Sequence, residues 1–214
     1  MKEFFIFTVI FIDGLGNNTA FAQNSDFLQG LQSGNEDSFR YLVDQYQVKV
    51  IRTCKGFVHS LADAEDIAQD VFIEVYESAG KFRGNSELST WIYRIAVNKS
   101  LNFLRSSRRR KVLSIFDTLL SNDGSQVPEP SSGYEMSPDN QIQNEEQSRA
   151  INEAMEALPT KQRTAFVLSK YDDLSYKEIA VIMETSVSSV ESLIFRAKGN
   201  LQKRLFSFYK KNLL

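Results

Sequence analysis

SYKEIAVIMETSVSSVESLIFRAKGNLQKRL, residues 175–205, is the stretch that decides the fold. It opens with a capping box from Ser175 to Glu178, in which the serine oxygen and the glutamate carboxylate can each satisfy a free backbone N–H. A short helix follows, residues 184–187 form a turn, and a second capping box is predicted from Ser188 to Glu191. Two capped helices, one short and one long, joined by a tight turn, are typical of a helix-turn-helix.

The longer of these two helices has two distinct faces. One face is apolar at steps of three and four and comprises Val190, Ile194, Ala197, Leu201 and Leu205. The opposite face carries small residues first and cations further along, at Ser189, Ser192, Arg196, Gly199 and Lys203. This order suits a helix that lies in the major groove of DNA, although a plain helical hairpin remains an alternative.

Helical spacing also dominates the rest of the chain, and no stretch alternates long enough to predict a strand. Apolar residues recur at steps of three and four in 36–58, and a second apolar stripe runs through 63–79. After a loop at 81–89, Ser89 or Thr90 is expected to cap a long helix that begins at Trp91 and frays near 108–111. The predicted fold class is therefore all-α.

The net charge is only −2, but the charges are strongly segregated. Residues 63–79 contain six carboxylates and no Lys or Arg, whereas residues 88–116 contain seven basic residues and no acid. Along the second of these segments one helix face combines amides and cations, at Arg94, Asn98, Asn102, Arg105 and Arg109. Such blocks predict surfaces for different partners, and solvated faces are the alternative.

One internal segment interrupts this helical pattern. Residues 121–140 hold three of the four prolines and have no apolar period, as in a flexible acidic linker. We therefore expect two small helical domains, at 24–111 and 148–208, joined by a linker at 112–147.

The first 23 residues resemble a secretory signal peptide. An apolar run from Phe4 to Ile12 is followed by Ala20-Phe21-Ala22, which has the form of a signal-peptidase site. The run is too short to span a membrane, and Asp13 places a charge directly against it. The alternative, which we favour, is a non-functional extension of a cytoplasmic protein; a role as a membrane tether stays open.

The composition argues against catalysis and metal binding. Cys54 is the only cysteine and His59 the only histidine, so disulfides, thiolate metal cages and most histidine-based sites are excluded. There is no phosphate-cradling glycine loop. The sequence predicts no enzyme activity, no metal, no cofactor and no small-molecule substrate.

Several motifs resemble the extracytoplasmic-function sigma factors of bacterial RNA polymerase. DIAQDVF at 66–72, FRG at 82–84 and TWIYRIAVN at 90–98 are similar to region 2 of that family. Three further motifs resemble region 4 of the family, namely LP at 158–159, LSYKEIA at 174–180 and IFRAK at 194–198. The resemblance implies an initiation factor that recruits core RNA polymerase to specific promoters and helps to melt the DNA.

The resemblance also assigns roles to residues. The polymerase-binding surface would comprise Asp66, Gln69, Asp70 and Glu74. The downstream promoter element would be bound by Phe82, Trp91, Arg94, Asn98, Asn102, Arg105 and Arg109. Phe82 and Asn98 match family positions that capture an unstacked base, for which an aromatic ring and an amide are suitable groups, whereas Trp91 could equally be a core residue. The upstream element would be read by Ser188, Ser189, Ser192, Arg196 and Lys203.

The expected partners are core RNA polymerase, promoter DNA and an anti-sigma factor, either soluble or membrane-bound. One departure from the family pattern bears on promoter reading: Glu191 and Leu193 stand where family members commonly carry Arg. We explain Glu191 by its capping box, and a carboxylate could also accept from cytosine.

Two other functions compete with this reading. A response regulator would share the helix-turn-helix but needs an α/β receiver domain, and residues 25–110 show no strands. A secreted helical binding protein would explain only the first 23 residues.

Overall fold

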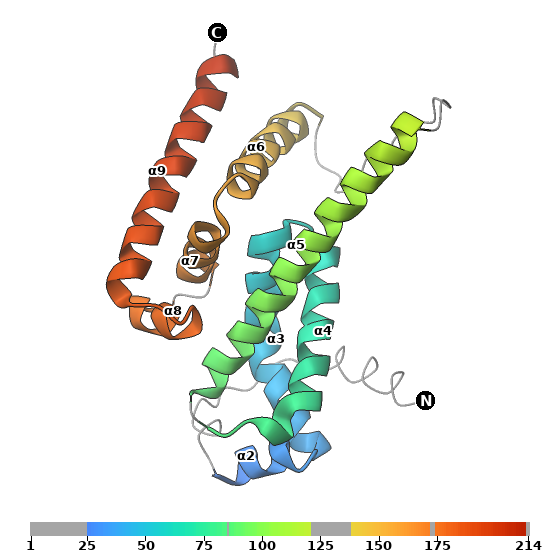
Figure 1. Cartoon of the computed structure of the whole chain (residues 1–214), viewed down its shortest axis with the longest axis vertical. Coiled ribbons are helices and arrows are strands. Elements are labelled where there is room, and N and C mark those ends of the chain that lie inside the picture. Colours follow the sequence, from blue (N-terminus) through green and yellow to red (C-terminus); the bar gives the residue numbers. More distant parts are fainter. Residues whose placement is uncertain (1–24, 85, 121–137, 172–173, 213–214) are drawn as a thin grey trace.

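The computed structural model describes residues 25–84, 86–120, 138–171 and 174–212, and every regular element in these ranges is a helix (Figure 1). The first domain contains α2 (Ser25–Gln32), α3 (Glu36–Val58), α4 (Leu61–Ser78), the short 3₁₀ helix η2 (Ala79–Lys81) and α5 (Leu88–Leu120). The second contains α6 (Pro138–Glu156), α7 (Thr160–Tyr171), α8 (Tyr176–Ile182) and α9 (Val187–Asn212). The predicted all-α fold is confirmed. The signal-like segment 1–23 and residues 121–137 of the predicted linker lie outside the described residues.

The first domain is a bundle of α3, α4 and α5 around one apolar core. Its fully buried centre includes Leu42, Val50, Val71, Val75 and Ile92. A side chain caps the start of each of the first two bundle helices. Before α3, the Asn35 Oδ1 accepts from the Ser38 N–H at 2.9 Å, and before α4 the Ser60 Oγ accepts from the Asp63 N–H at 3.3 Å.

Helix α2 was not predicted as a separate element, yet it belongs to this domain. Phe27 and Leu31 are 7% and 5% exposed and join the core of the bundle. Its last residue, Gln32, donates from Nε2 to the carbonyl of Phe82 at 2.7 Å and so connects α2 to the loop before α5. At eight residues, its apolar pattern is too short to be recognised by periodicity.

The helix-turn-helix is present, but only its first capping box is correct. The Ser175 N–H donates to Glu178 Oε2 at 2.7 Å, and the Glu178 N–H donates to Ser175 Oγ at 3.3 Å. The second box, predicted at Ser188–Glu191, is wrong, because α9 begins at Val187 and the Ser189 N–H donates to Ser186 Oγ at 3.2 Å.

The turn between the two helices explains this shift. Glu184 has a left-handed backbone (φ 52°), and the Thr185 N–H returns to the carbonyl of Ala180 at 2.9 Å. This closes α8 early and leaves Ser186 as the residue that caps α9. The exposed Glu191 therefore has no capping role.

The long helix α5 also differs from its prediction at both ends. It begins at Leu88, where Leu88 and Thr90 are buried, and it continues through the basic run to Leu120 instead of fraying near 108–111. Helix α6 likewise begins at Pro138, so both ends of the predicted linker 112–147 are helical.

The two domains are packed against each other, with α3 and α5 of the first in contact with α7 and α8 of the second (Figure 1). Phe57, Tyr93 and Val97 of the first domain are buried in a cluster whose other fully buried members include Leu168, Ile179 and Ile194. Helical periodicity does not reveal this shared core, because each of these residues also fits the apolar stripe of its own helix.

Candidate nucleic-acid and protein-binding surfaces

Helix α4 presents an acidic face opposite its buried stripe. Asp66 and Asp70 are exposed and Gln69 is half-buried, while Ile67 and Val71 on the other side are in the core. These three polar residues lie together as predicted. Because no basic side chain lies among them, the face is negatively charged, and a negative face attracts cationic partners.

Glu74, the fourth residue predicted for this surface, has an internal partner. Its Oε2 lies 2.8 Å from Nζ of Lys99 on α5, and the hydrogen bond to Glu74 raises the pKa of Lys99. This pair connects α4 to α5 at a site where both side chains are partly exposed. Exposed pairs of this kind contribute less than about 1 kcal/mol to stability.

The predicted polar and basic face of α5 forms a continuous strip. Asn98, Asn102, Arg105 and Arg109 are all exposed. Arg105 donates from Nη1 to Oδ1 of Asn102 at 3.0 Å, which fixes the amide beside the guanidinium. Two cations one helical turn apart, preceded on the same face by two amides, can contact successive phosphates and base edges of a nucleic acid.

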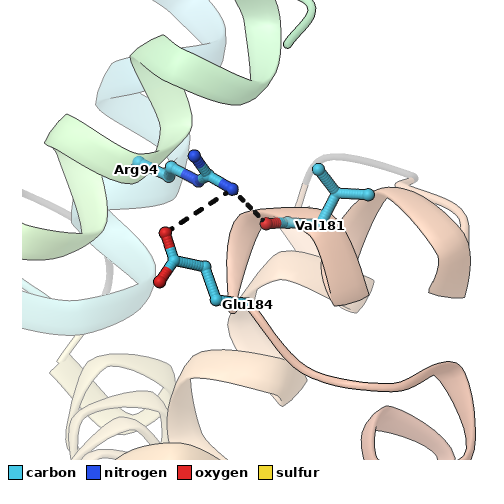
Figure 2. Close-up of polar contacts among 3 residues, drawn as sticks. All are labelled: Arg94, Val181 and Glu184. Carbon is cyan, nitrogen blue, oxygen red and sulfur yellow. Dashed lines mark hydrogen bonds and ion pairs between the residues drawn. The ribbon is translucent and has the colours of Figure 1, made fainter. Parts of the chain in front are cut away.

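Arg94, at the start of this strip, is engaged by the second domain (Figure 2). Its Nη2 donates to the carbonyl of Val181 in α8 at 2.6 Å and lies 3.7 Å from Oε1 of Glu184. Sequence periodicity placed Arg94 on the correct face but could not show that α8 covers it. Of the cations and amides predicted on α5, Arg94 is therefore the one that the second domain engages.

Phe82 and Trp91 contact each other beside the start of α5. Their ring centroids are 4.9 Å apart with the planes inclined at 32°, and both rings are partly buried against the first core. The backbone of Phe82 is held on both sides, because its N–H donates to Ala79 and its carbonyl accepts from Gln32. Trp91 thus packs beside the Phe82 ring.

Two cations flank this aromatic pair and were not predicted as site residues. Lys81 and Arg83 are both exposed on either side of Phe82. The signal was present in the sequence as Lys-Phe-Arg, since alternating cations and an aromatic ring are typical of single-strand binding.

The outer face of α9 is open along the length that was predicted. Ser188, Ser192, Arg196 and Lys203 are exposed and Ser189 is half-buried. Leu193 packs against the core of the second domain, which accounts for an apolar residue at this position. Phe195 is 80% exposed beside Arg196 and was missed; an aromatic residue outside the apolar period of a candidate DNA-reading helix was the available signal.

A buried cation at the domain interface was also missed. Arg163 of α7 is only 3% exposed and donates from Nη2 to the carbonyl of Phe57, with Nε2 of His59 at 3.3 Å. Burial lowers the pKa of Arg163; burial, together with the charge of Arg163, lowers the pKa of His59 to about 4. His59 is therefore neutral near pH 7 and can accept a hydrogen bond from the guanidinium.

The chain matches two family models, one for Sigma-70 region 2 at residues 42–110 and one for Sigma-70 region 4 at residues 148–201. It is 33% identical to the RNA polymerase sigma-H factor of Pseudomonas aeruginosa over 185 residues, which cover 86% of this chain and 94% of that relative. It is 35% identical to the ECF RNA polymerase sigma-E factor of Escherichia coli K12 over 181 residues, covering 83% and 92%.

These matches define a class of protein, the RNA polymerase sigma factors built from regions 2 and 4. Within this class, the chain belongs to the extracytoplasmic-function group. It is accordingly a transcription initiation factor and not an enzyme, and the family and general function predicted from the sequence are confirmed.

The fold is also seen in a solved structure of CnrH in complex with the cytosolic domain of CnrY. The TM-score is 0.60 at 20% identity, covering 85% of this chain and 96% of that one. None of the helices among the described residues is long and apolar enough to span a membrane.

Proposed function

We propose that the three surfaces divide the work of initiation among them. The acidic face of α4 (Asp66, Gln69, Asp70 and Glu74) binds core RNA polymerase. The basic strip of α5, with Phe82 and Trp91, binds and helps to open the downstream promoter element. The outer face of α9 (Ser188, Ser189, Ser192, Arg196 and Lys203) reads the upstream element. Residues 24–111 form the unit that carries the first two surfaces and residues 148–208 the unit that carries the third, and residues 112–147 connect them.

The observation that carries this proposal is the separation of charge between adjacent helices of one bundle. Exposed carboxylates gather on α4, and exposed cations and amides gather on α5. A polyanion such as DNA is attracted to the second face and repelled by the first, which leaves the first for a protein partner.

The proposed partners are core RNA polymerase, promoter DNA and an anti-sigma factor. CnrH, which shares the fold, has been seen in complex with the cytosolic domain of another protein, CnrY. We place the protein in the cytoplasm, because its polymerase and its promoters are there.

Transcription from a promoter library, with core polymerase plus this protein, tests the proposal. The expected result is a set of start sites that share two sequence elements and require the protein. Library transcription that does not depend on the protein would contradict it. Repeating the assay with Arg105→Ala/Arg109→Ala and with Arg196→Ala assigns the downstream element to α5 and the upstream element to α9.

A further inference from the structure

Phe82, which lies between η2 and α5, is held at its backbone and at its ring by three different elements. Its N–H donates to the carbonyl of Ala79 in η2 at 3.0 Å, and its own carbonyl accepts from Nε2 of Gln32 in α2 at 2.7 Å. Its ring lies 4.9 Å from that of Trp91 near the start of α5. Bonds at both the N–H and the carbonyl fix the two planar peptide groups that flank Phe82, and with them the direction in which its side chain leaves the backbone.

The helix end that carries Gln32 is itself fixed. Gly34 has a left-handed backbone (φ 77°), and its N–H donates to the carbonyl of Leu31 at 3.1 Å. The Asn35 N–H donates to the carbonyl of Gly30 at 2.9 Å. Together these bonds form the Schellman motif, which closes the C-terminal end of a helix. The amide of Gln32 therefore projects from a helix end with a defined conformation.

Close backbone approach places α2 against two neighbours, α3 and η2 (Figure 1). Gly30 lies so near α3 that a Cβ at this position would come within 2.3 Å of Oγ of Ser38. On the other side, a Cβ on Gly80 of η2 would lie 3.6 Å from the carbonyl oxygen of Gln32, which is van der Waals contact. Helix α2 thus touches the segment that leads directly to Phe82.

The bond from Gln32 to Phe82 contributes little to the stability of the domain. Gln32 is exposed, so water competes for the same carbonyl. Helix α2 is attached to the bundle through Phe27 and Leu31, which are 7% and 5% exposed. The consequence of the bond is orientation, because it selects one setting of the Phe82 carbonyl among those that water would satisfy equally well.

We propose that Gln32 is a positioning residue for promoter opening, whose amide holds Phe82 in the orientation that receives an unstacked base of the downstream element. The inference rests on the proposed function of Phe82 in binding that element. If the ring is held in place before DNA arrives, its backbone need not be ordered during binding, and preorganised groups bind more tightly for this reason. Gln32 acts through the backbone of Phe82 and does not itself touch the base.

Gln32→Met offers the most direct test, because methionine keeps the length and the helix propensity of glutamine but cannot donate to the carbonyl. Gln29→Met, at an exposed position one turn earlier on α2, is the matched control. Each protein is combined with core polymerase, and permanganate measures the opening of a promoter recovered from the transcription library. Melting temperature and helicity of the free proteins verify folding.

The expected result is that Gln32→Met needs a holoenzyme concentration about two- to tenfold higher than Gln29→Met to open half of the promoter. This range corresponds to the usual contribution of one neutral hydrogen bond. The melting temperatures of the two variants should agree. Equal opening by the two variants would overturn the proposal.

A combination with Phe82→Ala separates positioning from a merely structural role. If Gln32 acts through Phe82, Gln32→Met causes no further loss once the ring is absent, so the two losses are not additive. The double variant should therefore open the promoter as well as Phe82→Ala alone. Additive losses would mean that Gln32 acts elsewhere, and the proposal would then be wrong.

Gln32→Glu covers the case in which the methionine variant does not fold. Glutamate has the shape of glutamine, but its carboxylate only accepts hydrogen bonds and repels the carbonyl of Phe82. Gln29→Glu is its control, since it adds the same charge to the same helix. Gln32→Glu should need a higher holoenzyme concentration than Gln29→Glu, and equal requirements contradict the proposal.

The same proteins distinguish failure of the inference from failure of the proposed function. If Phe82→Ala opens the promoter as well as the unmodified protein does, the ring is not a platform for a base and the proposed function of Phe82 is wrong. If Phe82→Ala loses opening and Gln32→Met does not, the platform stands and only the positioning role of Gln32 is refuted.

Discussion

The two candidate DNA-binding helices, α5 and α9, differ in what surrounds them. The candidate face of α9 is exposed at Ser188, Ser192, Arg196 and Lys203, whereas the strip on α5 is engaged at Arg94 by the second domain. Both helices show the same pattern in sequence, an apolar stripe on one side and cations on the other. The difference teaches that periodicity locates a functional face but does not reveal what another domain places on it.

A third surface, the acidic face of α4, is free of the domain interface, and disturbing it should have the largest effect. Asp70→Lys is expected to weaken binding to core RNA polymerase by several kcal/mol, because it places a like charge against a cationic partner surface. The measurement is the affinity for core polymerase, with helicity as a check on folding. Glu153→Lys, an equal charge reversal at an exposed position of α6, is the control. Unchanged affinity of Asp70→Lys would remove α4 from the polymerase surface.

The exposed part of the α5 strip is tested by Asn98→Ala. A bidentate base contact provides roughly 1–3 kcal/mol of discrimination, whereas an exposed substitution usually changes stability by within about 0.5 kcal/mol. We therefore expect less promoter opening and weaker base preference at the downstream element, with nearly the same melting temperature. Permanganate footprinting of the melted region measures the first effect. Unfolding of the first domain instead would mean that Asn98 is structural.

The open helix α9 is tested by Arg196→Ala. Loss of one guanidinium should reduce transcription about tenfold from a promoter that depends on its upstream element, and should lower the salt slope of binding by about one. Phe195→Ala is informative beside it, because a ring can contact a thymine methyl group without changing the salt slope. An equal loss on promoters that lack the upstream element would indicate a folding defect.

The sequence predicted most of this architecture because strong local signals coincide with tertiary roles. The apolar stripes of α3, α4 and α9, the cap at Ser175 and the charge blocks are all local, and the structure has them where they were expected. Three features could not be predicted. Leu88 starts α5 early because it is buried by neighbouring helices, Ser186 caps α9 because of the left-handed turn at Glu184, and Arg163 is buried only by contact with a remote domain.

The interface that distinguishes α5 from α9 should also be sensitive to acid. His59 faces Arg163 and Glu156, and burial together with Arg163 lowers its pKa from 6.5 to about 4. The folded protein therefore binds fewer protons at this site than the unfolded chain. As a result, the free energy of unfolding keeps its full value above pH 6.5 and declines as the pH falls towards 4.

His59→Asn should remove part of this dependence, and asparagine tolerates the left-handed backbone of His59 (φ 65°). Melting temperatures across this pH range measure the effect as the difference between the two proteins, which cancels the carboxylates that they share. Parallel pH profiles for the two proteins would show that His59 does not contribute.

The smallest effect is expected from removal of residues 1–23. Among the described residues, the core of the first domain begins with α2 (Ser25–Gln32), and Phe27 and Leu31 are the first buried side chains. A chain that begins at Asn24 keeps this helix and should support transcription as well as the full chain does.

A chain that begins at Ser33 is the matched control, because it also loses α2. Burying one such side chain contributes about 1.5–3 kcal/mol, so this second truncation should lower the melting temperature clearly, and loss of Gln32 frees the carbonyl of Phe82. Equal activity of the full chain and the Asn24 chain, together with a loss in the Ser33 chain, would place the functional start of the protein at α2. Fractionation with N-terminal sequencing decides the remaining alternative. Mature protein that begins at Gln23 and lies outside the cytoplasmic membrane would overturn the cytoplasmic placement, since a sigma factor that has been exported cannot reach its polymerase.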